Sequence, residues 1–267
     1  MHMGVHPKSI YKKPKTRKKY WRPSDEELLS QIKAIIDARP TYGYKRVTAM
    51  VNKLRGGLDL SKVNKKRIYR VMKTSGLMLP KISRTRAHKP TGKIMTLHSN
   101  TRWCSDCFEI KCFNGEKVYV SFILDCCDRE IIAFIVKKEP ILACDIQQMM
   151  LEAVEKRFSK TMAPRQIEFL SDRGSIYRAM TTVEMGRRLN LKSCFTAAYS
   201  PESNGMAEAV VGTYKRDYVY VNDCESADST IQLVPGWFED YNQQAPHSAL
   251  EMMSPTEYYK VNLNRVA

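Results

Sequence analysis

Three strand-like runs follow one another between residues 102 and 137, and their order limits the folds open to this chain. The runs are WCSDCFEI, KVYVSFILD and EIIAFIV, and all three are rich in β-branched and aromatic residues. Asn114-Gly115 joins the first two, and a polar corner at Asp128-Arg129 joins the last two. Because both connections are short, the sequence predicts an antiparallel meander.

Helices and strands alternate after this meander. Apolar residues recur at helical spacing from Ile141 to Phe158, QIEFL predicts a fourth strand, Ser175 to Leu189 a second helix and LKSCFTA a fifth strand. Two further helices, at residues 203–219 and 226–243, are expected to complete the chain. This order predicts an α/β fold with a mixed five-stranded sheet and helices on both faces, which is the ribonuclease H-like arrangement.

A small helical unit is expected before the sheet. Ser24 and Glu27 predict a capping box for a helix that stops at Pro40, and two more helices are predicted before Gly57 and between Asn64 and Gly76. A three-helix unit with a basic last helix is typical of helix-turn-helix DNA readers, although lysines exposed for solubility give the same pattern. The residues of the last helix predicted to contact DNA are Lys66, Arg67, Arg70 and Lys73.

The net charge of +16 is distributed unevenly along the chain. Residues 1–100 hold 25 lysines and arginines against 5 acidic residues, whereas the remaining 167 residues hold 19 basic and 23 acidic side chains. A basic front half favours a polyanionic partner, nucleic acid first and an acidic membrane second. A cationic surface that serves solubility alone is the other interpretation.

These features together predict four segments. They are a basic N-terminal arm at 1–23, a helix-turn-helix-like DNA-binding domain at 24–80, a basic linker at 81–100, and a catalytic core with C-terminal helices at 101–267.

The eight cysteines lie mostly in apolar segments and are interpreted as reduced thiols. A zinc site at Cys104 and Cys107 is the alternative, but no second close pair of ligands follows them. No apolar run of about 18 residues is present, and no apolar signal segment follows the basic N-terminus. The sequence therefore predicts a soluble, cytoplasmic protein.

Three acidic residues fall on elements that can meet at one end of the predicted sheet. Asp106 lies in the middle of the first strand, where alternation places it on the same face as Phe108 and Ile110. Asp172 directly follows the fourth strand, at a position where α/β sheets usually present ligands. Glu208 follows Asp172 after an interval of 35 residues, which leaves room for a helix, a strand and a turn back to the sheet.

A single acidic residue near a strand is ordinarily a solvated charge or a cap, and Asp125 and Glu109 are interpreted in that way. The combination of order, element type and spacing separates Asp106, Asp172 and Glu208 from such residues. Two unit charges about 4 Å apart repel by roughly 4 kcal/mol at an effective dielectric near 20, so a close carboxylate cluster requires cations. Oxygen ligands favour Mg²⁺ or Mn²⁺ over zinc, and two such ions can promote in-line phosphoryl displacement.

Stretches around these carboxylates resemble the DDE transposases of bacterial insertion sequences, specifically the large OrfB-type product, which share the catalytic core of retroviral integrases. The stretches are RWCSDCFEI, LDCCDREI, LSDRGSIY, SPESNGMAEAVVGTYKRDY and YNQQAPHSALEMMSPTEYY, and they span nearly all of residues 102–259. Upstream, PTYGYKRV and NKKRIYRVMKTSGL are similar to the helix-turn-helix segment that precedes this core in the same family. The resemblance covers about the whole chain after residue 24.

The resemblance implies roles for particular residues. Asp106, Asp172 and Glu208 match the metal-binding catalytic triad of the family, and their last interval fits its usual spacing. Lys215 lies seven residues after Glu208 on the same helical face, where related enzymes place a basic contact to the element's end DNA. The neighbouring Arg216 is assigned to the same DNA. An exposed lysine on an amphipathic helix is the alternative interpretation of Lys215.

Ser203, Asn204 and Gly205 lie at the expected start of the helix that carries Glu208. Backbone amides and the positive end of the helix dipole at such a place can hold a phosphate. Ser203 and Asn204 are therefore further candidates for DNA contact.

The resemblance also implies a reaction and its partners. The terminal inverted repeats of the element are nicked to free 3′-hydroxyls, which attack DNA without a covalent protein intermediate, typically through a circular copy of the element. Enzymes of this kind act as dimers or larger assemblies on paired ends, in the cytoplasm and on the nucleoid. Family members are commonly made as frameshift fusions with an upstream part, so an upstream-frame partner is expected.

Two other functions use the same residues or the same fold. A ribonuclease H-type or structure-specific nuclease would need the same carboxylates and metals but would join no strands. A DNA-binding regulator, or a decayed transposase fragment that represses its element, would keep its function after loss of one carboxylate.

Overall fold

The computed structural model describes residues 22–80, 96–196 and 205–266. The chain divides into two compact units, one formed by Met1–Ala38 with Tyr42–Pro80 and the other by Arg39–Thr41 with Lys81–Ala267. The predicted N-terminal arm lies outside the described residues except for its last two positions, and the predicted linker is described only from residue 96. None of the described helices is long and apolar enough to cross a membrane.

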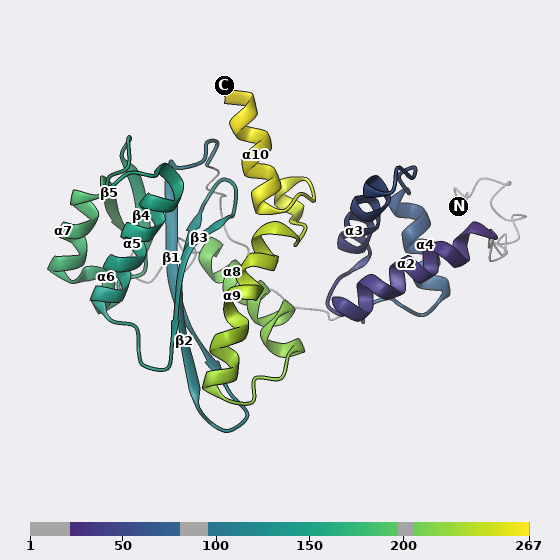
Figure 1. Cartoon of the computed structure of the whole chain (residues 1–267), viewed down its shortest axis with the longest axis horizontal. Helices are drawn as coiled ribbons and strands as arrows, with labels where there is room; N and C mark the ends of the chain where they lie inside the picture. The colour runs from purple at the N-terminus through teal and green to yellow at the C-terminus, as the bar shows by residue number, and fades with distance from the viewer. Residues whose placement is uncertain (1–21, 81–95, 197–204, 267) are drawn as a thin grey trace, which may run out of the picture. The chain divides into compact units, whose positions relative to one another are not determined.

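The first unit consists of the three expected helices (Figure 1). Their bounds are Ser24–Ala38 for α2, Tyr44–Gly57 for α3 and Lys65–Thr74 for α4. One apolar side of each helix faces a shared core, as the helical spacing of the sequence predicts. The fully buried residues of this core include Ile32, Val47, Val51, Ile68, Val71 and Met72.

Helix α2 begins differently from the prediction. Ser24 and Glu27 do not pair as a capping box, because the Ser24 hydroxyl accepts a hydrogen bond from Arg67 and the Glu27 carboxylate accepts one from Gln31. The carboxylate of Asp25 instead accepts the N–H of Arg22 at 3.0 Å and stabilises the start of the helix.

The second unit contains a five-stranded sheet of order β3-β2-β1-β4-β5. The strands are β1 (Arg102–Lys111), β2 (Lys117–Asp125), β3 (Ile131–Lys137), β4 (Ile167–Ser171) and β5 (Leu191–Phe195). The first three pair antiparallel, and β4 and β5 run parallel to β1. The predicted meander and its two crossover strands are therefore confirmed.

Helices cover both faces of this sheet (Figure 1). Helices α5 (Ala143–Phe158), α6 (Ser175–Arg178) and α7 (Met180–Arg188) pack on one face, and α8 (Gly205–Asp217) and α9 (Ala227–Gln243) pack on the other. The single helix expected from Ser175 to Leu189 is broken at Ala179, whose ψ of 132° leaves the helical region. A further helix, α10 (Pro255–Val266), was not predicted.

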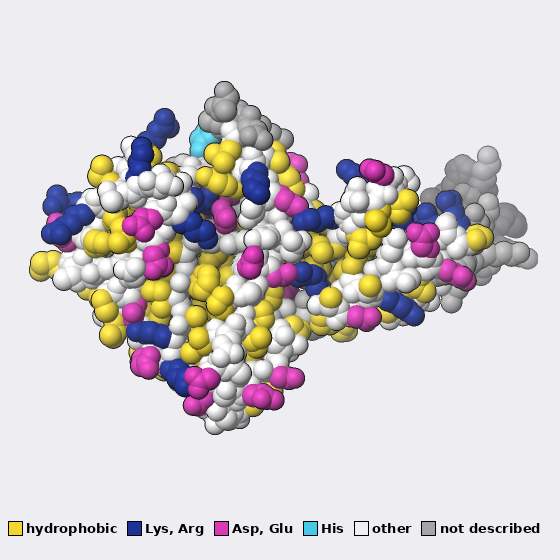
Figure 2. Space-filling view, in the orientation of Figure 1, with side chains coloured by type: hydrophobic (Ala, Val, Ile, Leu, Met, Phe, Trp, Pro, Cys, Tyr) yellow, Lys and Arg dark blue, Asp and Glu magenta, His cyan; other side chains and the backbone are white. Residues whose placement is uncertain are grey.

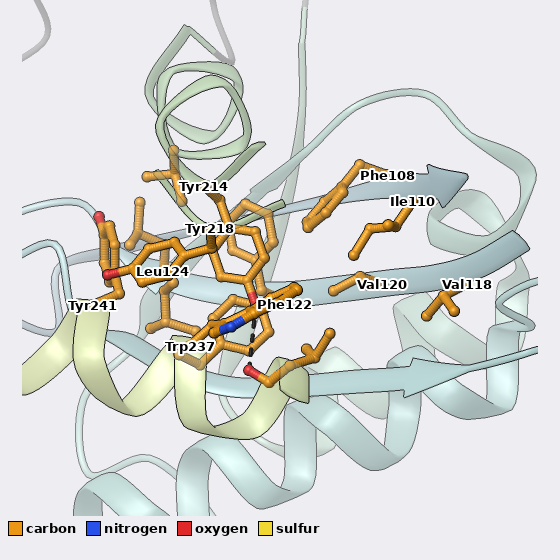
Figure 3. Packing of buried hydrophobic residues seen from close by; sticks show 14 of the residues in the cluster. Phe108, Ile110, Val118, Val120, Phe122, Leu124, Tyr214, Tyr218, Trp237 and Tyr241 are labelled. Carbon is orange, nitrogen blue, oxygen red and sulfur yellow. Dashed lines mark hydrogen bonds between the residues drawn. The ribbon is translucent and has the colours of Figure 1, made fainter. Parts of the chain in front are cut away.

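Helix α8 is fixed against β1 and α9 by Tyr214. This fully buried ring lies 5.6 Å from the ring of Phe108 and 4.6 Å from that of Phe238, centroid to centroid (Figure 3). Its hydroxyl donates a hydrogen bond to the carbonyl of Val234 at 3.2 Å, so the polar end of the buried ring is satisfied. The residues on α8 therefore have a defined position relative to β1.

Asp125 is a buried cap and not a solvated charge. Its carboxylate accepts the N–H groups of Asn100, Cys127 and Asp128 and closes the corner after β2. Burial, and then the negative charge of Asp128, raise the pKa of Asp125 to about 7. Glu109, by contrast, is exposed on β1 and forms an ion pair with Lys117.

Candidate active site

The register between β1 and β4 brings Asp172 next to Asp106. In this parallel pair, Trp103 lies opposite Phe169 and Cys104 lies opposite Leu170. Strand β4 ends one residue later, and Asp172 follows it directly. Asp106 and Asp172 each lie two residues beyond the last pair of this ladder, so the register places the two residues near one another just past the point where the pairing ends.

Asp106 points to the side of the sheet that α8 covers. Phe108 and Ile110, which share its face of β1, pack in the same buried cluster as Ala207 and Val210 of α8. This confirms the predicted alternation along β1. Glu208 lies between these two buried helix residues and is itself exposed, in the first turn of α8.

The charges of Asp172 and Glu208 act on the carboxylate of Asp106. Burial is the main reason that the pKa of Asp106 is raised to about 6, and the negative charges of Asp172 and Glu208 raise it further. The backbone N–H of Cys107, 2.8 Å from Oδ1 of Asp106, and the charge of Lys215 oppose the shift. Charges from a loop and a helix thus reach the carboxylate on β1.

The arrangement fits a hard divalent cation in its chemistry, although it is not closed around one. Among the residues that the structure describes, no three His, Cys, Asp or Glu side chains are arranged to hold a metal ion as they stand. Asp172 and Glu208 are both exposed, so their rotamers can change without repacking of the core. Carboxylate oxygens are the ligands that Mg²⁺ prefers, and a cation there would offset the repulsion that acts on Asp106.

Two features of the site were not expected from the sequence. Oδ1 of Asp172 accepts the N–H of Gly174 at 2.9 Å, and a Cβ atom on Gly174 would lie 3.0 Å from that oxygen. Tyr177 is buried behind β1, where its hydroxyl lies 2.8 Å from the hydroxyl of Ser105. The DRG sequence was a possible signal for the Asp172 turn, whereas the position of Tyr177 depends on how α6 packs.

Lys215 lies beside the carboxylates, whereas Arg216 pairs with the neighbouring Asp217. The ammonium of Lys215 is 5.5 Å from the centroid of the Phe108 ring, next to Asp106 on β1, and its charge lowers the pKa of Asp106. The guanidinium of Arg216 is exposed and pairs with Asp217, 2.7 Å between Nε and Oδ1. Ser203 and Asn204 lie outside the described residues.

The four basic residues predicted to contact DNA from α4 fall into two pairs. Lys66 and Lys73 are exposed to solvent. The other two are held by Asp25, which is fully buried: Nε of Arg67 lies 2.8 Å from its Oδ1, and Nη2 of Arg70 lies 2.7 Å from its Oδ2. Arg67 and Arg70 therefore join α4 to α2, whatever else they contact.

Charge on the surface of the second unit is mixed. Basic and acidic side chains are interspersed over the face of this unit seen in Figure 2, in keeping with its nearly balanced composition.

Comparison with known proteins identifies the family. Residues 97–201 and 189–255 each match an integrase core domain family, and residues 23–86 match an HTH-like domain family. Transposase InsD of insertion element IS2 from Escherichia coli is 41% identical over 240 residues, which cover 88% of this chain and 79% of that protein. This chain belongs to the insertion-sequence transposases. Transposases of this family have an integrase-type catalytic core and are polynucleotidyl transferases.

A second relative of the transposase is a protein of insertion element IS136 from Agrobacterium fabrum. It is 51% identical over 170 residues, which cover 63% of this chain and 87% of that protein. Among solved structures, a simian T-cell lymphotropic virus intasome chain is similar with a TM-score of 0.49 at 14% identity, covering 86% of this chain and 74% of its own. The Mos1 transposase catalytic domain, solved with Mg and raltegravir, has a TM-score of 0.43 at 18% identity, covering 60% of this chain and 76% of its own.

Proposed function

We propose that this transposase nicks the ends of its element and joins the freed 3′-hydroxyls to DNA, with Asp106, Asp172 and Glu208 as its catalytic carboxylates. The observation that carries the proposal is the β1–β4 register, which brings Asp172 near Asp106, and the charges of Asp172 and Glu208 both raise the pKa of Asp106 in keeping with it. Like charges brought near a half-buried carboxylate are costly for stability alone. Their presence in an integrase-type core supports a role in phosphoryl transfer.

The same three residues are proposed to hold Mg²⁺ or Mn²⁺, with two ions during catalysis. Bound there, the cations would supply Lewis-acid stabilisation of the attacking and departing oxygens. The protein holds the ligands in place: the N–H of Cys107 fixes Asp106, the N–H of Gly174 fixes Asp172, and Tyr214 fixes the helix that carries Glu208. Lys215 places a positive charge beside the carboxylates, where a DNA phosphate must enter.

Recognition of DNA is assigned to several parts of the chain. Lys66 and Lys73 are exposed on α4 and are proposed to contact phosphates of the terminal inverted repeats, with Arg67 and Arg70 shaping that surface through Asp25. In the core, Lys215 and Arg216 are proposed to contact the element end, together with Ser203 and Asn204. The predicted division at 1–23, 24–80, 81–100 and 101–267 remains part of this proposal.

The assembly and location of the enzyme follow from its reaction. Two element ends must be processed together, so a homo-oligomer on paired ends is proposed, with an upstream-frame part as a possible fusion partner. Binding to element ends and to target DNA would associate the protein with the bacterial nucleoid.

The test is the Asp172→Asn variant with element-end DNA and Mg²⁺. We expect loss of both cleavage and the joining of pre-nicked ends, whereas binding to the ends is largely retained. Glu184→Gln is the matched control, since Glu184 is a partly exposed acid on α7 that pairs with Arg187 and Arg188. Unchanged cleavage by Asp172→Asn would contradict the assignment.

The same assay separates the alternatives. A ribonuclease H-type nuclease would cut an RNA–DNA hybrid and would not join pre-nicked ends. A regulator would repress its element equally well before and after the Asp172→Asn substitution.

A further inference from the structure

A pocket of about 520 Å³ opens between the end of β1 and the end of α8. Its lining includes Lys111 and Phe113 from the β1 side, Lys215 from α8, and Tyr220 from the short helix η2 (Val219–Val221). Strand β4 pairs with β1 only from Arg102 to Cys104, and no strand among the described residues pairs with the later residues of β1 on that edge. The size is that of a pocket for a small organic group.

The walls of the pocket are joined to one another. The N–H of Phe113 donates to the carbonyl of Cys224 at 2.8 Å, and the N–H of Asn114 donates to the carbonyl of Glu225 at 3.2 Å. The carboxylate of Glu116 accepts the N–H of Ala227 at the start of α9. The hairpin after β1 is therefore bonded to the segment after η2, and the pocket is built before any ligand enters.

Two aromatic rings of the pocket are exposed without an evident role in the core. Phe113 is 73% exposed and Tyr220 is 74% exposed. Large apolar groups exposed together at a pocket usually mark a binding site. Flat rings of this kind suit a flat aromatic ligand, because each ring can stack on it.

The charge of the pocket favours an anion. Lys111 and Lys215 both line it. Among the described lining residues the acidic side chain is Glu109, and its carboxylate lies 2.9 Å from the ammonium of Lys117. Aromatic rings combined with lysines are the features by which proteins bind single-stranded nucleic acid.

We propose that this pocket receives one unstacked nucleotide of the DNA strand being processed, with its base on Phe113 and Tyr220 and its phosphate between Lys111 and Lys215. The inference rests on the proposed function and names a subsite of that same substrate. Lys215 lines the pocket and also lies beside Asp106, so one strand of DNA can reach both places.

The position of this nucleotide follows from the geometry of β1. Each strand residue advances about 3.3 Å, so Glu109 and Lys111 lie roughly 10 and 17 Å along β1 from Asp106. A B-form strand advances about 3.4 Å per nucleotide. For a DNA strand that follows β1, the unstacked nucleotide lies about three to five nucleotides from the phosphate that is cut.

The test measures binding and cleavage of element-end duplexes that carry one unpaired nucleotide, placed in turn at each position near the cleavage site. The full-length enzyme with Mg²⁺ is expected to prefer the duplex unpaired about three to five nucleotides from the cut. Phe113→Ala and Tyr220→Ala should each lose about tenfold in affinity for that duplex, which corresponds to one lost base–aromatic stack. Met180→Ala, which removes an exposed apolar side chain of α7 outside the pocket, should bind as the wild type does.

The outcomes separate this inference from the proposed function. If the wild type cleaves and joins ends but both aromatic variants keep its preference for the unpaired duplex, the pocket assignment is wrong and the catalytic assignment stands. If Asp172→Asn still cleaves, the catalytic assignment fails whatever the pocket does. Duplexes unpaired on the element side of the cut are compared with duplexes unpaired on its flanking side, and the side that the enzyme prefers is the part of the strand that enters the pocket. If the enzyme prefers an unpaired nucleotide on neither side, the inference is overturned.

Discussion

Asp106 and Asp172 each lie two residues beyond the last pair of the β1–β4 ladder, Cys104 and Leu170. The backbone register therefore brings them near one another. The fold therefore holds two like charges together, and Glu208 on α8 adds a third. A substitution can remove one charge without altering the elements that carry the others.

Asp106→Asn should stabilise the protein in the absence of divalent cations and abolish its cleavage activity. The folded-state pKa of Asp106 is raised to about 6 from an ordinary value near 4, chiefly by burial. A raised acid pKa costs stability as pH rises, so the gain from Asn should grow between about pH 4 and pH 6 and then level off at about 1–3 kcal/mol. Chemical denaturation of wild type and variant at several pH values in EDTA measures this gain in the free energy of unfolding. A gain that is the same at pH 4 and pH 7 would contradict its origin in the raised pKa of Asp106.

Gly174→Ala should impair catalysis with little effect on stability. The backbone of Gly174 has a φ of −55°, which alanine adopts freely, but its Cβ would lie 3.0 Å from Oδ1 of Asp172. The carboxylate must shift by a few tenths of an ångström, and because a misplacement of about 1 Å can cost about 100-fold in rate, a smaller, severalfold loss of cleavage rate is expected. Gly212→Ala is the control, because a Cβ there meets nothing within 4 Å. Equal cleavage rates for the two variants would show that the Asp172 turn is unimportant.

Asp25→Asn should destabilise the helical unit by about 2–3 kcal/mol at neutral pH. Burial alone would raise the pKa of Asp25, but the N–H of Arg22 and the charges of Arg67 and Arg70 lower it overall. A lowered acid pKa contributes stability above the unfolded-state value near 4, and this contribution is lost as pH falls through the folded-state value. Thermal unfolding should therefore separate wild type and variant at pH 7 and bring them together in acid. Asp37→Asn, on the exposed side of α2, should change little at either pH.

Much of the core could be predicted because its signals are local. Alternation along β1 placed Asp106 on the same face as Phe108, and short polar connections fixed the meander. The carboxylates could be proposed from order and spacing, but their mutual influence depends on the register of β4, which no local pattern contains. The resemblance to insertion-sequence transposases supplied what spacing alone left open, and the comparisons confirm that family.

The differences between the predicted and the observed helices have specific physical reasons. Helix α10 carried a usable signal in Ser254-Pro255-Thr256-Glu257, since Ser254 and Glu257 form reciprocal hydrogen bonds at its start. The break at Ala179 had no comparable signal. The start of α2 depends on tertiary contacts, because Arg67 donates hydrogen bonds to the hydroxyl of Ser24 and to the carboxylate of Asp25.

The buried ion pair of Arg157 provides a last prediction, about what holds α10. Arg157 has 3% of its side chain exposed, and Nη2 lies 3.1 Å from Oδ1 of the fully buried Asp128. Its guanidinium also lies 4.1 Å from the ring centroid of Tyr259 on α10. Arg157→Ala should therefore cost about 3–5 kcal/mol, because it leaves the buried carboxylate without its cation and removes the surface on which Tyr259 packs.

An ion pair on the surface of the same unit is the control for this prediction. Arg187 pairs with Glu184 at 2.9 Å, but its side chain is 78% exposed, so Arg187→Ala should cost under about 1 kcal/mol. Urea unfolding of both variants measures the two costs, and proteolysis near residue 255 reports release of α10. Similar small losses for both arginines would mean that Asp128 finds another partner or takes up a proton, and protection of α10 in Arg157→Ala would show that Tyr259 does not depend on the guanidinium.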